Sequence, residues 1–271
     1  MDSLSPAACR RAAEQLLLGR VQPPQPISHL PTDCRPQSVP DAMAIQDQLH
    51  DLLTESGRGK VVGTKIGCTT PVMQSYLGMT HPCAGGIFES TVFDQDSQVP
   101  HGQFLHVGVE CEIAVRIGRE IPPRERPYQR SDLVEHVEAV FAAIEIVDDR
   151  YVDFANREPD WKTWVADDFF GAGLVLGTPV TDWQPLDLAA TQGEMRINGT
   201  KVGQGLGRDI IDGHPLEALV WLANAESSRG RTIPAGWLVT LGSVVQTQWV
   251  NRGDLVTVNL DGLGPASVRF S

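Results

Sequence analysis

Residues 107–118, VGVECEIAVRIG, limit the fold more strongly than any other part of the sequence. Side chains alternate between the two faces of a β-strand, and here the alternation is almost complete. One face would carry only apolar residues: Val107, Val109, Cys111, Ile113, Val115 and Ile117. The pattern predicts a strand, and it is the clearest strand signal in the chain.

The first sixty residues have a sequence pattern of helices and prolines, in contrast to the strand pattern at 107–118. Residues 6–19 predict a short amphipathic helix, and the prolines of 21–39 predict a connector without regular structure. A second helix is expected to begin at Pro40, because proline is favoured in the first turn of a helix. We therefore expect residues 1–60 to form a helical N-terminal segment with a proline-rich connector, and residues 61–271 to form a mixed-sheet domain.

Beyond residue 60, short apolar runs are separated by Gly, Pro and Asn. They predict strands at 61–67, 143–149, 237–249, 254–260 and 266–270, a hairpin turn at Asn198-Gly199, and helices over 71–78, from Ser131 through residue 141, and from Pro215 to Gly230. Many strands, few helices and one hairpin predict an α+β fold with a mixed, curled or barrel-like β-sheet.

Composition excludes several classes of protein. The formal net charge of −12, without clustered Lys and Arg, argues against a nucleic-acid partner. No stretch approaches the roughly 18 apolar residues that cross a bilayer, so we expect no membrane partner. The five cysteines are scattered and lack CxxC spacing, which favours reduced thiols over disulfides or a zinc site. Together these features predict a cytoplasmic location.

Three glutamates are the strongest candidates for a functional site. Glu110 and Glu112 share the second face of the strand at 107–118, where neighbours on one face lie about 7 Å apart. Glu145 lies in the apolar run AAIEIV, where a carboxylate must be protonated, paired or bound to metal. If the three converge, they form an all-oxygen site that suits Mg²⁺ or Mn²⁺.

Alternatives to this site stay open at the level of sequence. The strand pair can be two solvated glutamates, and Glu145 can pair with Arg150 or Arg116. Lys65, in GTKIG, is a lone cation in an apolar strand. It is either a functional group with a pKa lowered by burial or a strand-edge lysine that reaches solvent.

Several segments together resemble the hydratase and decarboxylase branch of the fumarylacetoacetate hydrolase superfamily, the 2-keto-4-pentenoate hydratase / 4-oxalocrotonate decarboxylase family. The segments are KIGCTT at 65–70, GVECEIAVRIG at 108–118, AAIEIVDDR at 142–150, GHPLEALVWLAN at 213–224, and the late LVTLGSVV followed by GDLVTV. They occur in consistent order from about Pro40 to the C-terminus. Together they are specific, although none would be so alone.

The resemblance implies a mixed β fold with a helical N-terminal segment, assembled as a homo-oligomer. It implies a Mg²⁺ site, with Mn²⁺ as an alternative, at Glu110, Glu112 and Glu145, and an active-site lysine at Lys65. For a small 2-oxo acid substrate, we assign substrate contacts to Phe170, Ser243 and Arg150, and we assign Asp168 as a candidate catalytic, water-orienting base.

The activity that the resemblance implies is hydration of a 2-hydroxy-2,4-dienoate to a 4-hydroxy-2-oxo acid in aromatic catabolism. One alternative is decarboxylation of a 4-oxalocrotonate-type 2-oxo diacid. Another is a non-catalytic partner subunit of a paired hydratase–decarboxylase complex. Each alternative predicts the same metal site with a different outcome of turnover.

Two segments depart from the pattern of the family. Relatives carry an acidic residue in a Pro-Asp-x-Gly element, where this chain has Pro82-Cys83-Ala84-Gly85. A thiol replaces a carboxylate as a proton relay at neutral pH only if its pKa is strongly perturbed. Relatives also carry small residues after Ala-Asp-Asn, where this chain has Phe169-Phe170, which predicts a tighter or more apolar pocket.

Overall fold

The computed structural model describes residues 3–271, so the first two residues of the expected N-terminal segment lie outside it. Within this range the strands form two sheets, a larger one of seven strands and a smaller one of five. The larger sheet has the order β2 (Cys83–Phe88), β1 (Val61–Gly67), β10 (Leu238–Trp249), β5 (Val107–Ile117), β6 (Val137–Asp148), β7 (Gly171–Leu176) and β3 (Val92–Asp94). The smaller sheet has the order β4 (Ser97–Val99), β12 (Gly264–Phe270), β11 (Leu255–Leu260), β8 (Gln192–Ile197) and β9 (Thr200–Leu206).

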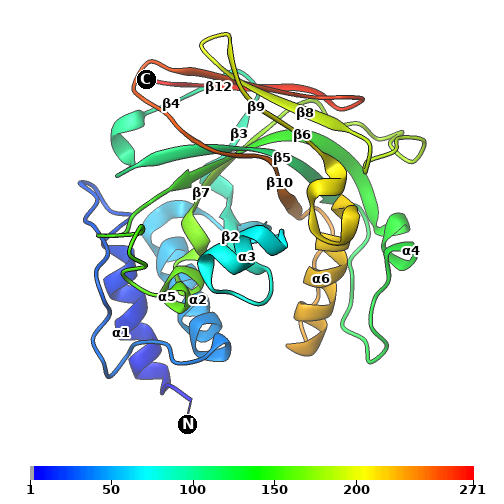
Figure 1. Cartoon of the computed structure of the whole chain (residues 1–271). Coiled ribbons are helices and arrows are strands. Elements are labelled where there is room, and N and C mark those ends of the chain that lie inside the picture. The colour runs from blue at the N-terminus through cyan, green and yellow to red at the C-terminus, as the bar shows by residue number, and fades with distance from the viewer. Residues whose placement is uncertain (1–2) are drawn as a thin grey trace.

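The helices lie mainly on one side of the larger sheet, and the smaller sheet covers its other side (Figure 1). The helices are α1 (Pro6–Leu17), α2 (Val39–Leu53), α3 (Pro71–Leu77), α4 (Arg130–Leu133), α5 (Trp161–Ala166) and α6 (Pro215–Ser228). Among the described residues, no helix has the length and apolar character needed to cross a membrane. The mixed, curled sheet of the sequence prediction is confirmed.

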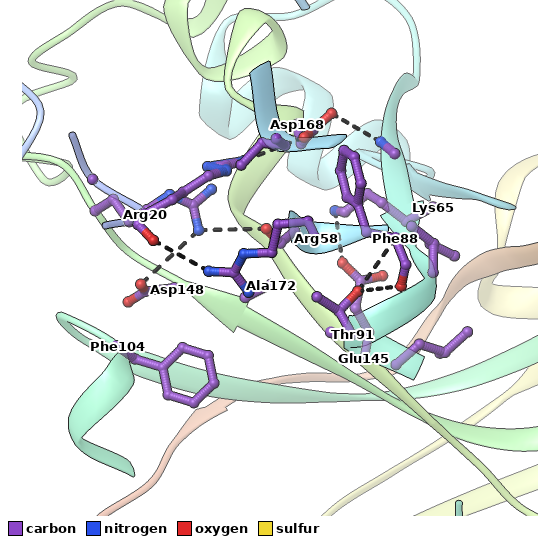
Figure 2. Close-up of a pocket in the computed structure, with 18 of the residues that line it drawn as sticks. Arg20, Arg58, Lys65, Phe88, Thr91, Phe104, Glu145, Asp148, Asp168 and Ala172 are labelled. Carbon is purple, nitrogen blue, oxygen red and sulfur yellow. Dashed lines mark hydrogen bonds and ion pairs between the residues drawn. The ribbon is translucent and has the colours of Figure 1, made fainter. Parts of the chain in front are cut away.

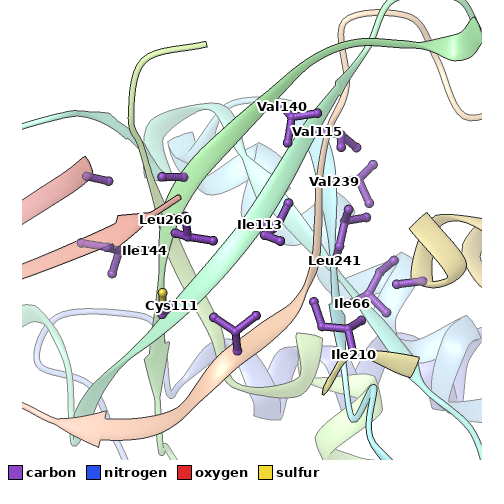
Figure 3. Close-up of a cluster of buried hydrophobic side chains, with 14 of the residues drawn as sticks. Ile66, Cys111, Ile113, Val115, Val140, Ile144, Ile210, Val239, Leu241 and Leu260 are labelled. Atoms are coloured by element: carbon purple, nitrogen blue, oxygen red, sulfur yellow. The ribbon is translucent and has the colours of Figure 1, made fainter. Parts of the chain in front are cut away.

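The core between the two sheets contains the apolar face of β5. All six residues predicted for that face have exposed fractions of 1% or less. Figure 3 shows Cys111, Ile113 and Val115 of β5 in one cluster with Ile144 of β6 and Leu260 of β11. Since this face is fully covered, the other face of β5 must carry the polar residues and look toward the helices.

A second core joins the N-terminal helices to the larger sheet. Hydroxyls of Ser5 and Ser38 accept hydrogen bonds from the first turns of α1 and α2, so both helices begin where a capping residue stands. Leu16 of α1 and Leu49 of α2 are buried in one cluster with Trp164 of α5. The helices and the residues after β6 therefore bury one another's apolar surface.

The helix expected from Ser131 through residue 141 is wrong beyond its first turns. A short α4 and a 3₁₀ turn end at His136, and β6 begins at Val137. Over its whole length β6 pairs with β5, from Ile117 opposite Val137 to Val107 opposite Asp148. The run VEAVF fits a strand as well as a helix, and pairing with a long neighbouring strand decides between them.

Other elements agree with the sequence analysis or were not anticipated. The turn at Asn198-Gly199 joins β8 and β9, as the hairpin signal predicts. Strands β2 and β7, with the sequences CAGGIF and GAGLVL, were missed. Their glycines remove the alternation of side chains that announces a strand.

Candidate functional site

Three glutamate side chains converge on the helix-facing side of the larger sheet. Glu110 of β5 lies directly opposite Glu145 of β6 in the antiparallel register, and Glu112 follows two residues along β5 on the same face. Each side chain offers an oxygen, and these oxygens all lie within 4.8 Å of one another. We call Glu110, Glu112 and Glu145 the carboxylate cluster. The convergence expected from the sequence is present.

Strand β10 supplies a hydrogen-bond donor to each member of the carboxylate cluster. The Thr247 hydroxyl donates to Glu110, the Thr240 hydroxyl donates to Oε2 of Glu145 at 3.2 Å, and the Gly242 N–H donates to Oε2 of Glu112 at 2.7 Å. Gly242 has a φ of +121°, and a Cβ atom there would collide with the side chain of Thr69. Only glycine can present its N–H at this point of the strand.

Lys65 is the cation beside the carboxylate cluster. It lies on β1, is 3% exposed, and its Nζ stands 2.8 Å from Oε1 of Glu145. This pairing replaces the Arg150 or Arg116 partner considered for Glu145, and Lys65 does not reach solvent. Burial alone would lower the pKa of Lys65, but Glu145 and Glu110 outweigh burial and hold that pKa above its ordinary value. The expectation of a lowered lysine pKa is wrong for this structure, in which the carboxylate cluster favours the charged lysine.

One positive charge does not balance three carboxylates. Burial, followed by repulsion from Glu145 and Glu110, raises the pKa of Glu112 well above its ordinary value. Burial also raises the pKa of Glu145. Within residues 3–271, Oε1 of Glu145 is buried and accepts no well-aligned hydrogen bond, although Nζ of Lys65 is close. Excess negative charge and oxygen-only donors fit a hard divalent cation such as Mg²⁺.

A second group of buried charges lies nearby, and we call it the arginine network: Arg20, His50, Arg150, Asp167 and Asp168. Asp167 binds Arg20 at 2.6 Å and Arg150 at 2.9 Å. Asp168 lies 2.6 Å from Nε2 of His50 and 3.3 Å from Arg20. The network joins the N-terminal segment to the turn before β7, and each carboxylate in it has at least two partners.

Asp168 is strongly held as an anion. Burial would raise its pKa, but His50 and Arg20 outweigh burial and lower the pKa to about 2. Its Oδ1 also accepts the N–H of Gly86 at 2.8 Å. A carboxylate with so low a pKa and with both oxygens engaged is a poor proton acceptor at neutral pH.

The turn that carries Asp168 is strained. Asp168, Phe169 and Phe170 have φ values of +56°, +45° and +68°, a conformation that costs free energy for residues other than glycine. It turns Phe169 toward Lys65, whose Nζ lies 5.0 Å from the ring centroid, and places Phe170 against Tyr151 instead. Phe169 therefore contacts the Lys65 side of the site, whereas Phe170 packs among other aromatic rings.

Two other expected substrate contacts are occupied by protein partners. Ser243 lies in the irregular part of β10, where its hydroxyl donates to the carbonyl of Val245 at 2.6 Å and accepts the N–H of Cys111 at 3.0 Å. Arg150 lines the cavity described next, but its guanidinium is bound by Asp167. Sequence reasoning did not single out His50 or Arg20, because their pairing depends on contacts more than one hundred residues away along the chain.

A cavity connects the two groups of charges (Figure 2). Its lining includes Lys65, Glu145 and Thr240, together with Arg20, Arg58 and Asp168. In Figure 2 Lys65 and Glu145 lie on the right and Arg20 lies on the left. Its remaining polar lining includes Asp148 and Arg150, and its apolar lining includes Phe88, Phe104, Ala172 and Leu174. The cavity therefore offers the Lys65–Glu145 pair, several arginine side chains and apolar surface.

Comparison with known proteins gives a consistent set of matches. Residues 87–271 match the family model described as fumarylacetoacetate (FAA) hydrolase C-terminal. The chain is 31% identical over 261 residues to a 2-keto-4-pentenoate hydratase of Paraburkholderia xenovorans, covering 96% of this chain and 94% of that protein. It is 32% identical over 244 residues to a 2-hydroxyhexa-2,4-dienoate hydratase of Comamonas testosteroni, covering 89% of each.

The fold is also found among solved structures. The 4-oxalocrotonate decarboxylase of Pseudomonas putida G7, complexed with magnesium and adipate, superimposes with a TM-score of 0.91 at 26% identity. The superposition covers 100% of both chains. Hydratases and a decarboxylase thus share this architecture.

Proposed function

Since the chain belongs to the fumarylacetoacetate hydrolase family, as its sequence motifs predicted, we propose that it is a metal-dependent hydro-lyase that hydrates a 2-hydroxy-2,4-dienoate to a 4-hydroxy-2-oxo acid in aromatic catabolism. The observation that carries the proposal is the carboxylate cluster, in which the buried Lys65 offsets the charge of one of three converging glutamates. Similarity to two named dienoate hydratases over most of the chain supports this reaction over others on the same fold.

Glu110, Glu112 and Glu145 would hold Mg²⁺, with Mn²⁺ as an alternative. When bound, the ion supplies Lewis-acid chemistry to a chelated carboxylate and 2-oxygen of the substrate. The β10 donors fix the orientation of the three carboxylates, so that the ligands are positioned before the ion arrives.

Lys65 would stabilise the negative charge that develops on the substrate oxygen during proton transfer and addition of water. The ammonium group pairs with Glu145 at 2.8 Å, so it is held at the carboxylate cluster, where that charge would develop. Phe169 covers this end of the site and limits the access of bulk water to Lys65.

Asp168 receives a positioning role in this proposal in place of the water-orienting role expected from the sequence. It binds the His50 imidazole and the Arg20 guanidinium, and of these two Arg20 lines the cavity. The diene chain of the substrate would lie along the apolar lining formed by Phe88, Phe104 and Ala172.

The test uses the purified chain with Mg²⁺ and freshly generated 2-hydroxypenta-2,4-dienoate, with loss of dienol absorbance and product mass as readouts. A product heavier by one water, with no turnover in Glu112→Gln, supports the proposal. Loss of CO₂ from a 2-oxo diacid without hydration of the dienoate would establish the decarboxylase instead. Tight metal binding without turnover of either would establish the partner-subunit role.

We further propose a cytoplasmic homo-oligomer, alone or paired with a decarboxylase subunit. All five cysteines are free and buried, which supports a reducing compartment. Light scattering of the purified chain gives the oligomer size directly. A monomer at assay concentration would refute the homo-oligomer.

A further inference from the structure

Arg58 is held in the cavity by an unusual turn at the end of α2. The helix passes into a π turn over Thr54–Arg58, and Arg58 is flanked by Gly57 with a φ of +93° and Gly59 with a φ of +79°. Two left-handed glycines on either side of one residue reverse the chain direction sharply around it. As a result the half-buried Arg58 side chain enters the cavity that holds Lys65 and Glu145.

The four cations that line this cavity differ in their partners. Arg20 and Arg150 bind Asp167, and Lys65 binds Glu145. Within residues 3–271, Arg58 has no carboxylate within 4 Å, and its one hydrogen bond goes to the main-chain oxygen of Arg20 at 3.2 Å. Arg58 is therefore the cavity cation without a counter-charge.

The surroundings oppose the charge of Arg58. Burial lowers the pKa of Arg58, and repulsion from Arg20 and Arg150 lowers it further. A guanidinium has five N–H donors in a planar fork that matches a carboxylate with two parallel hydrogen bonds. In Figure 2 this group lies between the Lys65–Glu145 pair and Arg20, with Ala172 beside it. A second anion entering the cavity would supply the missing counter-charge.

We propose that Arg58 is a specificity-determining residue that binds a second carboxylate at the far end of the substrate. This inference rests on the proposed function, in which the 2-oxo acid end lies at the carboxylate cluster. The preferred substrates are then 2-hydroxy-2,4-dienoates that carry a second carboxylate at the far end of the chain. Arg150, expected from the sequence to contact substrate, keeps Asp167 as its partner.

Binding of unreactive acids tests the inference without relying on turnover. With Mg²⁺ present, calorimetry would compare glutarate, adipate and pimelate with pentanoate, hexanoate and heptanoate, so that each pair differs only in the second carboxylate. A charge-assisted, two-pronged contact predicts that the best diacid binds about 10- to 100-fold more tightly than its monoacid partner. The length of the best diacid gives the reach between the two ends.

Two variants assign this preference to Arg58. Arg58→Gln should bind diacid and monoacid with equal affinity, and Arg58→Lys should keep part of the preference, because it retains the charge and loses the fork. Lys60→Gln is the matched control, since it removes the same charge from an exposed position two residues away that does not line the cavity. A purely structural role would lower the melting temperature of Arg58→Gln, whereas relief of repulsion should leave it unchanged or raise it.

The outcomes separate this inference from the proposed function. Equal binding of both acid classes by the unmodified chain, or a diacid preference that survives in Arg58→Gln, overturns the role of Arg58, even if the chain hydrates dienoates. A diacid preference that depends on Arg58 supports that role, even if the chain hydrates nothing. A turnover assay on the same samples tests the hydratase proposal separately from the role of Arg58.

Discussion

The carboxylate cluster and the arginine network are both buried, both charged and both adjacent to one cavity, yet they differ in charge balance. The cluster sets three carboxylates against one lysine, and the pKa values of Glu112 and Glu145 are raised. The network sets two carboxylates against two arginines and a histidine, and the pKa of Asp168 is lowered to about 2. The first has charge left over for a ligand, whereas the second uses its charge to hold segments of the chain together.

The largest effect that this contrast predicts is on metal binding. Glu145→Gln removes one ligand, so we expect divalent-ion binding to fall below detection and activity to fall by about 10²–10³-fold or more. Titration calorimetry with Mg²⁺ and Mn²⁺ measures the loss. Glu138→Gln is the control, because Glu138 lies on the same strand but pairs with Arg116 at the surface. Unchanged metal affinity in Glu145→Gln would contradict the site.

The next effect concerns the stability of the arginine network. Asp167→Asn leaves Arg20 and Arg150 buried without their shared partner, and breaking a buried pair in this way costs about 3–5 kcal/mol. Urea unfolding should show the midpoint falling by a corresponding amount. Asp33→Asn, which removes an exposed partner of Arg11, should leave the midpoint where it was. Similar curves for the two variants would mean that the network does not hold the fold.

The two groups should also respond to acid in opposite directions. The pKa of Asp168 is lower in the folded chain, so its stabilisation is complete above the unfolded value of about 3.9 and is lost as the pH falls toward 2, about 2 kcal/mol in all. The pKa values of Glu112 and Glu145 are raised, so their contribution is complete below their unfolded pKa of about 4.3 and is lost as the pH rises. Unfolding curves from pH 2 to pH 8 with EDTA should therefore show that the free energy of unfolding falls less steeply toward low pH in Asp168→Asn than in the unmodified chain. The same fall in both would show that Asp168 does not cause the loss of stability in acid.

The smallest effect is a gain. With EDTA present at neutral pH, the free energy of unfolding of Glu112→Gln should equal that of the unmodified chain or exceed it by up to about 1 kcal/mol, because the change relieves repulsion from Glu110 and Glu145. Urea unfolding measures the difference. The amide oxygen of the new side chain can still accept the Gly242 N–H. Magnesium should stabilise the unmodified chain and not this variant. A marked loss of stability without metal would show that the glutamate has a structural role.

The sequence predicted the carboxylate cluster because its members belong to regular elements. Alternation along β5 placed Glu110 and Glu112 on one face, and the apolar run around Glu145 required that carboxylate to have a partner. The curled mixed sheet was confirmed because local patterns of apolar residues specify its strands. The family resemblance rested on sequence motifs such as GVECEIAVRIG, and the family match confirms it. The resemblance placed Lys65 beside the metal site, but its pairing with Glu145 was not predicted, since β10 and β5 lie between β1 and β6 in the sheet.

The rest of the site depends on contacts that no local pattern records. Arg20 and His50 meet Asp168 across more than one hundred residues of chain, and nothing in their neighbours announces it. Which of Phe169 and Phe170 faces Lys65 depends on three consecutive residues with positive φ, a conformation that sequence propensities do not favour. The strand at 137–148 was predicted too short and with a helix before it, because VEAVF fits the periodicity of a helix and of a strand equally well. Only its pairing with β5 decides for the strand.

The residues of the cavity come from distant parts of the chain, and this has an evolutionary consequence. The carboxylate cluster belongs to β5 and β6, while Arg20 and Arg58 belong to the first sixty residues. If Arg58 selects the far end of the substrate, mutation in the short turn Thr54–Gly59 can retune which acid is accepted while the chemistry at β5 and β6 is inherited unchanged. Relatives that share one reaction centre could then diverge in substrate specificity through a few substitutions in this N-terminal turn.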